Sequence, residues 1–158
     1  TKVRPNVISY SAAVSACEKG GQWQQALALF HAIPKANIDL DVVSYNATIS
    51  ACEKGGQWQQ ALILFREMCA TMISPTVISY NAAVSACEKG GQWQQALFLL
   101  QTMPKANIRL DVISYSAAIS ACEKGGQWQQ SVTLFEKMLS ATVQQLTVFQ
   151  WLTVGGIA

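Results

Sequence analysis

An eleven-residue string, SACEKGGQWQQ, occurs four times in this chain of 158 residues, beginning at Ser15, Ser50, Ser85 and Ser120. Each copy begins 35 residues after the last. A fixed period of this length is typical of stacked supersecondary units, because one unit cannot bury its own apolar face and uses its neighbour to do so. We therefore expect a repeat array, whose function depends on what one repeat presents along the chain.

The period divides the chain into four units with short ends, namely residues 7–41, 42–76, 77–111 and 112–146. Residues 1–6 are expected to be the tail of a truncated preceding repeat, because Val3, Arg4, Pro5 and Asn6 occupy its last four positions. Residues 147–158 are expected to be a degenerate repeat start, around Val148–Trp151, or a disordered tail. We therefore interpret the chain as part of a longer repeat array.

Apolar spacing within the first unit predicts a pair of helices. The i, i+3, i+4, i+7 pattern of one stripe predicts a helix from about Ser9, as N-cap, to Lys19; its members are Tyr10, Ala13, Val14 and Cys17. Gly20 and Gly21 then break the helix, and a second one starts near Gln22 with the stripe Trp23, Ala26, Leu27 and Phe30.

Prolines and asparagines indicate how the second helices end. Pro34 and Pro104 should end or kink them, and Asn37 and Asn107 suit a left-handed turn just beyond. The predicted fold is all-α: an α-solenoid (right-handed superhelix) of four helix-turn-helix repeats. Its first helices should line the inner, concave surface.

The composition favours a packed core over chemistry. Hydrophobic residues make up 51% of the chain and charged residues 13%, and a net charge of +2 permits a nucleic-acid partner without requiring one. The cysteines lack the close spacing of a zinc site, so we expect small buried thiols and no metal at Cys17, Cys52, Cys69, Cys87 and Cys122. We expect no cofactor, no catalytic site and no membrane segment.

The opening V-[IV]-S-Y-[NS]-A of each unit, first seen at Val7–Tyr10, precedes a helical run that reads Ala61, Leu62, Leu64 and Phe65 in the second copy. A 35-residue helical pair with these features resembles the pentatricopeptide repeat (PPR) family, in its P-type form, over residues 7–146. Tetratricopeptide repeats are the nearest rival, with 34 residues and a different pattern. The resemblance implies a reader of single-stranded RNA that recognises one base per repeat.

In such proteins the fifth and last residues of a repeat read one base, and the second residue packs against the base face. The resemblance assigns base reading to the pairs Ser11 and Asp41, Asn46 and Thr76, Asn81 and Asp111, and Ser116 and Leu146. It assigns base packing to Ile8, Val43, Ile78 and Ile113.

The bases differ on their pairing edges in ways that these side chains can read. Guanine and uracil carry an imino N–H that an aspartate can accept, whereas adenine and cytosine carry a bare ring nitrogen. A short serine leaves room for a purine and a longer asparagine reaches a pyrimidine, so the array should read about 5′-G-Y-U-N-3′. Leu146 offers no hydrogen bond, which leaves the fourth base undefined.

Lysines recur at the end of each first helix, where they could meet successive phosphates; they are Lys19, Lys54, Lys89 and Lys124. A glutamate stands beside each one and dilutes the positive field; these are Glu18, Glu53, Glu88 and Glu123. The repeated tryptophans lie on the apolar stripe of the second helices, so we expect them in the core rather than stacked on bases.

Three functions remain open. The first is a sequence-selective RNA-binding module for organellar RNA processing, stabilisation, translation or editing, because the resemblance implies a mitochondrion or chloroplast. The alternative is a protein-binding helical scaffold of tetratricopeptide-like type, and protein partners are also compatible with the first function. The third is a recently duplicated array without a selected target. The fifth position varies only between Ser and Asn, and the last varies among Asp, Thr and Leu, which favours the base-reading function.

Overall fold

The computed structural model describes residues 6–154, and the side chains of residues 6–144. Over this range the helices are α1 (Val7–Lys19), α2 (Trp23–Lys35), α3 (Val42–Lys54), α4 (Trp58–Ala70), α5 (Val77–Lys89), α6 (Trp93–Thr102), the 3-10 helix η1 (Pro104–Ala106), α7 (Val112–Lys124) and α8 (Trp128–Val154). Strands do not occur in this part of the chain. The predicted all-α solenoid of helical pairs is confirmed.

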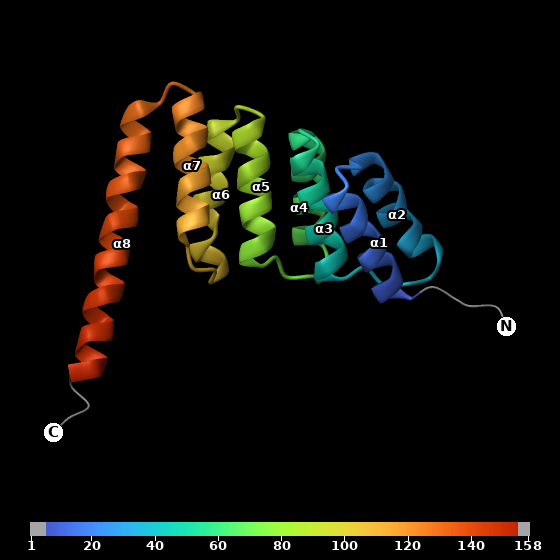
Figure 1. Cartoon of the computed structure of the whole chain (residues 1–158), viewed down its shortest axis with the longest axis horizontal. Helices are drawn as coiled ribbons and strands as arrows, with labels where there is room; N and C mark the ends of the chain where they lie inside the picture. Colours follow the sequence, from blue (N-terminus) through green and yellow to red (C-terminus); the bar gives the residue numbers. More distant parts are fainter. Residues whose placement is uncertain (1–5, 155–158) are drawn as a thin grey trace.

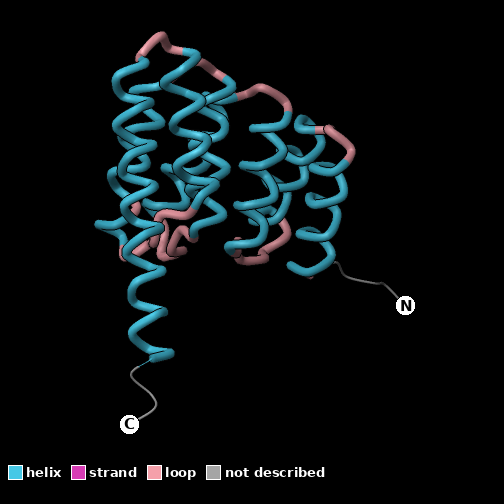
Figure 2. The backbone as a smooth tube through the Cα atoms, turned by 60° about the vertical axis from the view of Figure 1, so that its left-hand side comes forward, coloured by secondary structure: helices cyan, strands magenta, loops and turns pink. Residues whose placement is uncertain are grey.

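The helices stand side by side in one row, with α1 and α2 at one end and α8 at the other (Figure 1). Figure 2 shows the same row with short loops joining the helix ends. Successive first helices, α1, α3, α5 and α7, contact one another. The second helices α2, α4 and α6 each contact the first helices of their own and the next repeat, and α8 contacts α7. Within the described chain, successive second helices do not contact one another. The first helices are therefore closer together, and their side of the row is the inner, concave one.

The N-cap of each first helix is the last residue of the preceding unit. Asn6, Asp41, Thr76 and Asp111 accept a hydrogen bond from the backbone N–H three residues later. The expected N-cap at Ser9 is therefore wrong, because Ser9 is that N–H donor, at 3.0 Å from Asn6 Oδ1. A carboxylate or hydroxyl at the cap satisfies an orphan helix N–H.

The two glycines of each helical turn have different roles. The second, such as Gly56 with φ of 70°, adopts the left-handed conformation that a tight turn requires. The first has ordinary helical φ, but it receives a tryptophan of the previous repeat: a Cβ on Gly55 would overlap Trp23, and one on Gly90 would overlap Trp58. The expected left-handed turns at Asn37 and Asn107 are confirmed.

The core continues across the repeats. Phe30 meets Tyr45 edge-on with ring centroids 4.9 Å apart, and Phe65 meets Tyr80 in the same way at 4.8 Å. Three of the repeat cysteines are fully buried, namely Cys52, Cys87 and Cys122. Cys69 is exposed, which corrects the expectation of a buried thiol there, because it lies on the outer side of α4 near its end.

The fourth repeat ends differently from the other three. Pro34 lies near the end of α2 and Pro104 opens η1, whereas α8 runs unbroken from Trp128 to Val154 and past the ends of the other helices (Figure 1). Within the described chain α8 passes residue 147 without a break, and residues 131–154 contain no proline or glycine. Residues 1–5 and 155–158 lie outside the described chain. No described helix has both the length and the apolar content to cross a membrane.

Candidate nucleic-acid interface

The second residue of every unit is an exposed aliphatic side chain on a first helix. Ile8, Val43, Ile78 and Ile113 are between 55% and 73% exposed. In the second, third and fourth units, their neighbours at the third and fourth positions, for example Ser79 and Tyr80, are buried. The exposed aliphatic side chains at the second position of each repeat form a row of apolar patches, which can pack against the faces of planar ligands.

The predicted coding residues of the third repeat form one hydrogen-bonded cluster with the third residue of the next unit. Asn81 Nδ2 donates to Asp111 Oδ2 at 3.2 Å, and Ser114 Oγ donates to Asn81 Oδ1 at 2.6 Å. Ser114 also donates its backbone N–H to Asp111 Oδ1 at 2.7 Å, and its Oγ lies 2.7 Å from the same oxygen, so its single hydroxyl proton is shared between Asn81 Oδ1 and Asp111 Oδ1. The two side chains therefore have fixed orientations, with the Asn81 amide oxygen in contact with Ser114 and Asp111 Oδ2 in contact with the Asn81 amide nitrogen.

These contacts determine the charge state of Asp111. Partial burial opposes ionisation, but hydrogen bonds from the Ser114 backbone and hydroxyl and from the Asn81 amide outweigh it and lower the pKa of Asp111. The carboxylate is therefore ionised at neutral pH and acts only as an acceptor.

The second repeat has the same cluster with a hydroxyl in place of the carboxylate. Ser79 Oγ donates to Asn46 Oδ1 at 2.6 Å, and Asn46 Nδ2 lies 3.5 Å from Thr76 Oγ1. Thr76 and Ser79 exchange capping hydrogen bonds. A threonine hydroxyl can donate as well as accept, so this site can face a ring nitrogen or an N–H.

The first repeat has a serine at the fifth position. Ser11 is buried and its hydroxyl lies 2.9 Å from that of Ser44. Ser44 in turn donates to Asp41 Oδ1 at 2.6 Å. The buried side chain of Ser11, shorter than the asparagine of the second and third repeats, is therefore set back from the concave surface of the first helices. In the fourth repeat Ser116 is exposed, and the side chain of Leu146 lies outside the described part.

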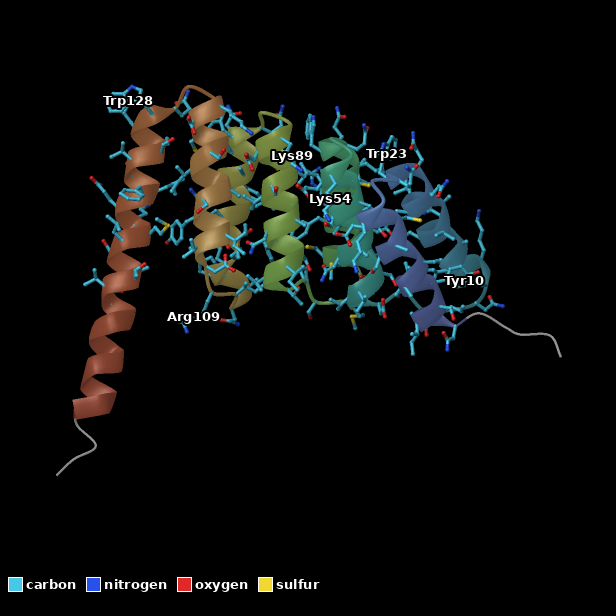
Figure 3. The ribbon with its side chains drawn as sticks, viewed as in Figure 1. Tyr10, Trp23, Lys54, Lys89, Arg109 and Trp128 are labelled. Carbon is cyan, nitrogen blue, oxygen red and sulfur yellow. The ribbon has the colours of Figure 1, made fainter. Side chains whose placement is uncertain are left out.

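Three of the four repeat lysines form ion pairs with the glutamate of the preceding repeat. Lys54 lies 2.7 Å from Glu18, Lys89 2.5 Å from Glu53, and Lys124 2.8 Å from Glu88. Lys54 and Lys89 are the last residues of α3 and α5, in the middle of the row (Figure 3). Among the described residues, Lys19 has no such partner because its glutamate would belong to a repeat before residue 7.

The ion pairs shift the pKa values of Lys54 and Glu88. The hydrogen bond from its ammonium to Glu18 raises the pKa of Lys54, against partial burial. Burial of Glu88 opposes ionisation, but hydrogen bonds from Lys124 and Ser120 prevail and lower its pKa. Both groups stay charged at neutral pH, and their fields largely cancel at the surface.

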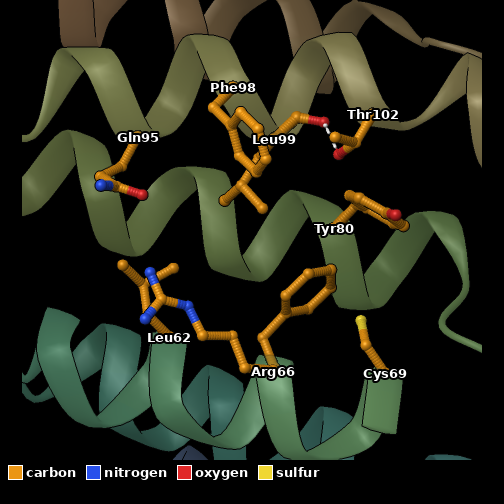
Figure 4. A pocket seen from close by; sticks show the side chains of 9 residues that line it. Leu62, Arg66, Cys69, Tyr80, Gln95, Phe98, Leu99 and Thr102 are labelled. Carbon is orange, nitrogen blue, oxygen red and sulfur yellow. Dashed lines mark hydrogen bonds between the residues drawn. The ribbon is translucent and has the colours of Figure 1, made fainter.

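A cavity of about 250 Å³ lies on the opposite, outer side between α4 and α6 (Figure 4). Its walls include Leu62, Arg66, Phe98 and Leu99, and none of the predicted coding residues lines it. Its lining is mostly apolar, and it is separate from the row of second-position aliphatics on the first helices.

The sequence did not predict the serines at the third position. Ser44, Ser79 and Ser114 are fully buried, and each contacts both predicted coding residues of the preceding repeat. Their signal was an N-cap residue followed three positions later by a hydroxyl, which is typical of a reciprocal cap. They connect the fold of each junction to the orientation of its coding side chains.

Comparisons with known proteins identify the repeats. The sequence profile of the PPR repeat family matches residues 5–54, 40–89 and 75–124, and that of the PPR repeat matches residues 113–143. No curated protein sequence matches the chain.

Two solved structures share the fold. One is the pentatricopeptide repeat protein PPR10 in complex with an 18-nt PSAJ RNA element, with TM-score 0.75 and 18% identity over 87% of this chain and 20% of that one. The other is the PPR domain of Arabidopsis thaliana protein-only RNase P 1 in complex with tRNA, with TM-score 0.76 and 11% identity over 96% of this chain and 82% of that one. The chain thus spans about a fifth of the PPR10 chain.

Proposed function

Because this chain belongs to the PPR repeat family, we propose that it binds single-stranded RNA along its first helices and reads one base per repeat. The two solved structures that share its fold each hold RNA, which supports this choice of partner. The observation that carries the proposal is the cluster of Asn81, Asp111 and Ser114, which fixes two polar side chains between the exposed aliphatic residues Ile78 and Ile113.

The third repeat selects uracil. Asp111 accepts the imino N–H of the base, because its carboxylate is ionised. The oxygen of Asn81 is occupied by Ser114, so its amide presents N–H to a carbonyl of the base. Cytosine is disfavoured by Asn81 and Asp111, because its unprotonated ring nitrogen would face the carboxylate and neither could donate a hydrogen bond.

The other repeats follow from the same chemistry. Asn46 with Thr76 selects a pyrimidine and favours cytosine, because a threonine hydroxyl can donate to the ring nitrogen. Ser11, set back against Ser44, leaves room for guanine, whose imino N–H meets Asp41. The fourth base has no assigned partner beyond Ser116, which gives 5′-G-Y-U-N-3′.

Binding is weak in this proposal. Each base held by packing and edge contacts contributes about 1–3 kcal/mol, against several for association and strand ordering. Three repeat lysines already have glutamate partners, so few cations remain for phosphates. We expect a dissociation constant in the micromolar range or above.

The ion pairs also favour a competing function, a protein-binding scaffold, because they remove the positive field that an RNA groove usually has. The row of exposed aliphatics would then hold a peptide. The roles that the family implies, in organellar RNA processing, stabilisation, translation or editing in a mitochondrion or chloroplast, belong to the RNA-binding proposal. In that proposal the chain guides RNA and does not itself catalyse.

The test is fluorescence anisotropy with a labelled strand containing 5′-GCUA-3′, the same strand annealed to its complement, and a strand with those bases permuted. The proposal expects micromolar binding to the first, no binding to the duplex, and binding to the permuted strand weakened at least about fivefold. Equal binding to the first and permuted strands would contradict base reading. Absence of binding to any RNA would favour the scaffold.

A further inference from the structure

The outer cavity of about 250 Å³ lies between the second helices of the second and third repeats (Figure 4). Leu62 and Phe65 of α4 line one wall, Phe98 and Leu99 of α6 line the other, and Tyr80 of α5 lies between them. Both repeats are internal to the array, so a further repeat at either end would leave this cavity unchanged.

The cavity differs from the equivalent place one repeat earlier in its hydrogen-bond acceptors. There the Tyr45 hydroxyl donates to Glu67 Oε1 at 3.0 Å. Tyr80 is the equivalent tyrosine, but Thr102 stands in place of the glutamate and donates its own hydroxyl to Leu99 O at 2.7 Å. Within the described chain the Tyr80 hydroxyl has no hydrogen-bond partner, although Tyr80 is only 6% exposed.

This unpartnered hydroxyl faces the cavity. Every side-chain nitrogen or oxygen that is sealed from solvent in the described part of the chain has a hydrogen-bond partner. The Tyr80 oxygen is therefore not sealed, and the space that Tyr80 lines is the cavity, where Figure 4 shows this oxygen on the Thr102 side. A nearly buried donor without a partner favours a ligand that supplies an acceptor.

The charge of the cavity wall favours an anionic acceptor. Arg66 of α4 is exposed, and Figure 4 shows its guanidinium on the Leu62 side of the cavity. Among the described residues no carboxylate pairs with Arg66, and none of those that line the cavity is acidic. An arginine without a counterion and a free hydroxyl donor together complement a carboxylate.

The rest of the wall suits the apolar part of a ligand. Leu62, Phe65 and Leu99 are buried side chains of the core that end at the cavity, and Phe98 is 62% exposed beside them. An engineered apolar cavity of about 150 Å³ holds one benzene ring. The larger volume here therefore accommodates an aromatic ring together with a short acidic chain.

We propose that this cavity binds a small apolar carboxylic acid with an aromatic ring. Its carboxylate accepts from the Tyr80 hydroxyl, as Glu67 does from Tyr45 one repeat earlier, and Arg66 balances its charge. Its ring lies between Leu62 and Phe98.

This combination occurs at one junction because the repeats differ at the positions concerned. In the other repeats the equivalents of Arg66 are His31, Gln101 and Glu136, and those of Thr102 are Ala32, Glu67 and Lys137. The cavity faces away from the predicted base-reading residues, so the proposal does not depend on RNA binding.

Titration of the isotope-labelled full chain with phenylacetate, followed by backbone amide NMR shifts, tests the proposal. We expect a dissociation constant of about 1 mM, as for a ligand of this size. The shifted amides should lie in α4, α6 and the first turns of α5. The neutral analogue phenylacetamide should bind about tenfold more weakly, because it lacks the charge that Arg66 and Tyr80 recognise.

Three variants test the contacts, with circular dichroism to verify folding. Tyr80→Phe removes the hydroxyl but keeps the ring that packs edge-on against Phe65, and it should weaken binding about tenfold. Arg66→Gln should weaken it about threefold, since this arginine is exposed. Thr102→Glu places a carboxylate where Glu67 accepts from the earlier tyrosine, so it should prevent binding of the acid.

Two matched controls remove the same groups elsewhere. Tyr45→Phe removes the equivalent hydroxyl one repeat earlier, and Arg109→Gln removes an exposed arginine that does not line this cavity; neither should change the affinity for phenylacetate. Absence of shifts up to about 20 mM phenylacetate, well above the expected constant, would overturn the proposal. So would equal binding of phenylacetamide, or an affinity that Tyr80→Phe and Thr102→Glu leave unchanged.

Discussion

Glu88→Gln should tighten the binding of single-stranded RNA, because it frees a lysine for the phosphates. In the native protein Lys124 Nζ lies 2.8 Å from Glu88 Oε1, and Ser120 Oγ donates to the same oxygen at 2.9 Å. Glutamine has nearly the same shape, and its carbonyl oxygen still accepts from Ser120, but it carries no charge. The loss of this partly exposed ion pair costs about 0.5 kcal/mol of stability, so the fold is retained.

The gain follows from counterion release. One new phosphate contact on a single strand changes the slope of log affinity against log salt by about −0.7. Relative to 1 M salt, that contact tightens binding about eightfold at 0.05 M and about fourfold at 0.15 M. Fluorescence anisotropy of a labelled strand over this salt range measures both the slope and the gain.

Glu123→Gln is the matched control, since it removes the same charge from the same helix position one repeat later. Within the described chain Glu123 has no lysine partner, so its loss frees no ammonium. We expect it to change binding much less than Glu88→Gln does. Equal effects of the two variants, or an unchanged salt slope for Glu88→Gln, would refute the reasoning and remove Lys124 from the interface.

Three further predictions concern packing and positioning. Gly90→Ala should destabilise the fold by about 1–3 kcal/mol because its Cβ overlaps a tryptophan, whereas Gly20→Ala should be neutral or stabilising by up to about 1 kcal/mol; urea unfolding distinguishes them. Ser114→Ala should cost about 1 kcal/mol of stability and reduce discrimination at the third base alone, measured by competition binding. Cys69 should react first with a thiol reagent at pH 8, while burial, which raises the pKa to about 11, should protect two thiols until the chain unfolds: Cys52 and Cys87.

Local sequence patterns predicted the elements well. Apolar spacing gave both helices of each repeat, and the glycine pair gave the turn between them, because these features depend on residues close in the chain. The N-cap was misplaced by three residues, since Ser9 and Asn6 are both capping types and only the backbone geometry separates them. The unbroken α8 could have been predicted from the absence of proline and glycine between Gly126 and Gly155.

The contacts between neighbouring repeats could not be predicted from the sequence patterns. The pairing of Lys54 with Glu18 joins residues 36 apart, and it depends on how far one repeat is displaced from the next. The same displacement brings Trp23 onto Gly55, so the first glycine of each pair is a packing position as well as part of a turn. The coding residues were inferred from family resemblance, and their hydrogen bonds to the third-position serines came only from the structure.

The measurement that tests base reading most directly is the third-base preference of Asp111→Ser. Serine is also a good N-cap, so it can replace the carboxylate as acceptor for the Ser114 N–H and keep α7 intact. Its hydroxyl can donate to the ring nitrogen of cytosine, which the carboxylate cannot do. The assay is competition binding of the native protein and the variant to strands that differ only at the third base.

The account predicts that the native protein favours uracil and that Asp111→Ser shifts the preference toward cytosine at that base alone. One well-matched edge contact gives about 5- to 150-fold discrimination, by analogy with the direct reading of DNA bases at about 1–3 kcal/mol. An unchanged preference for uracil, or an equal loss of affinity for every strand, would contradict the assignment of Asn81 and Asp111 and favour the scaffold function.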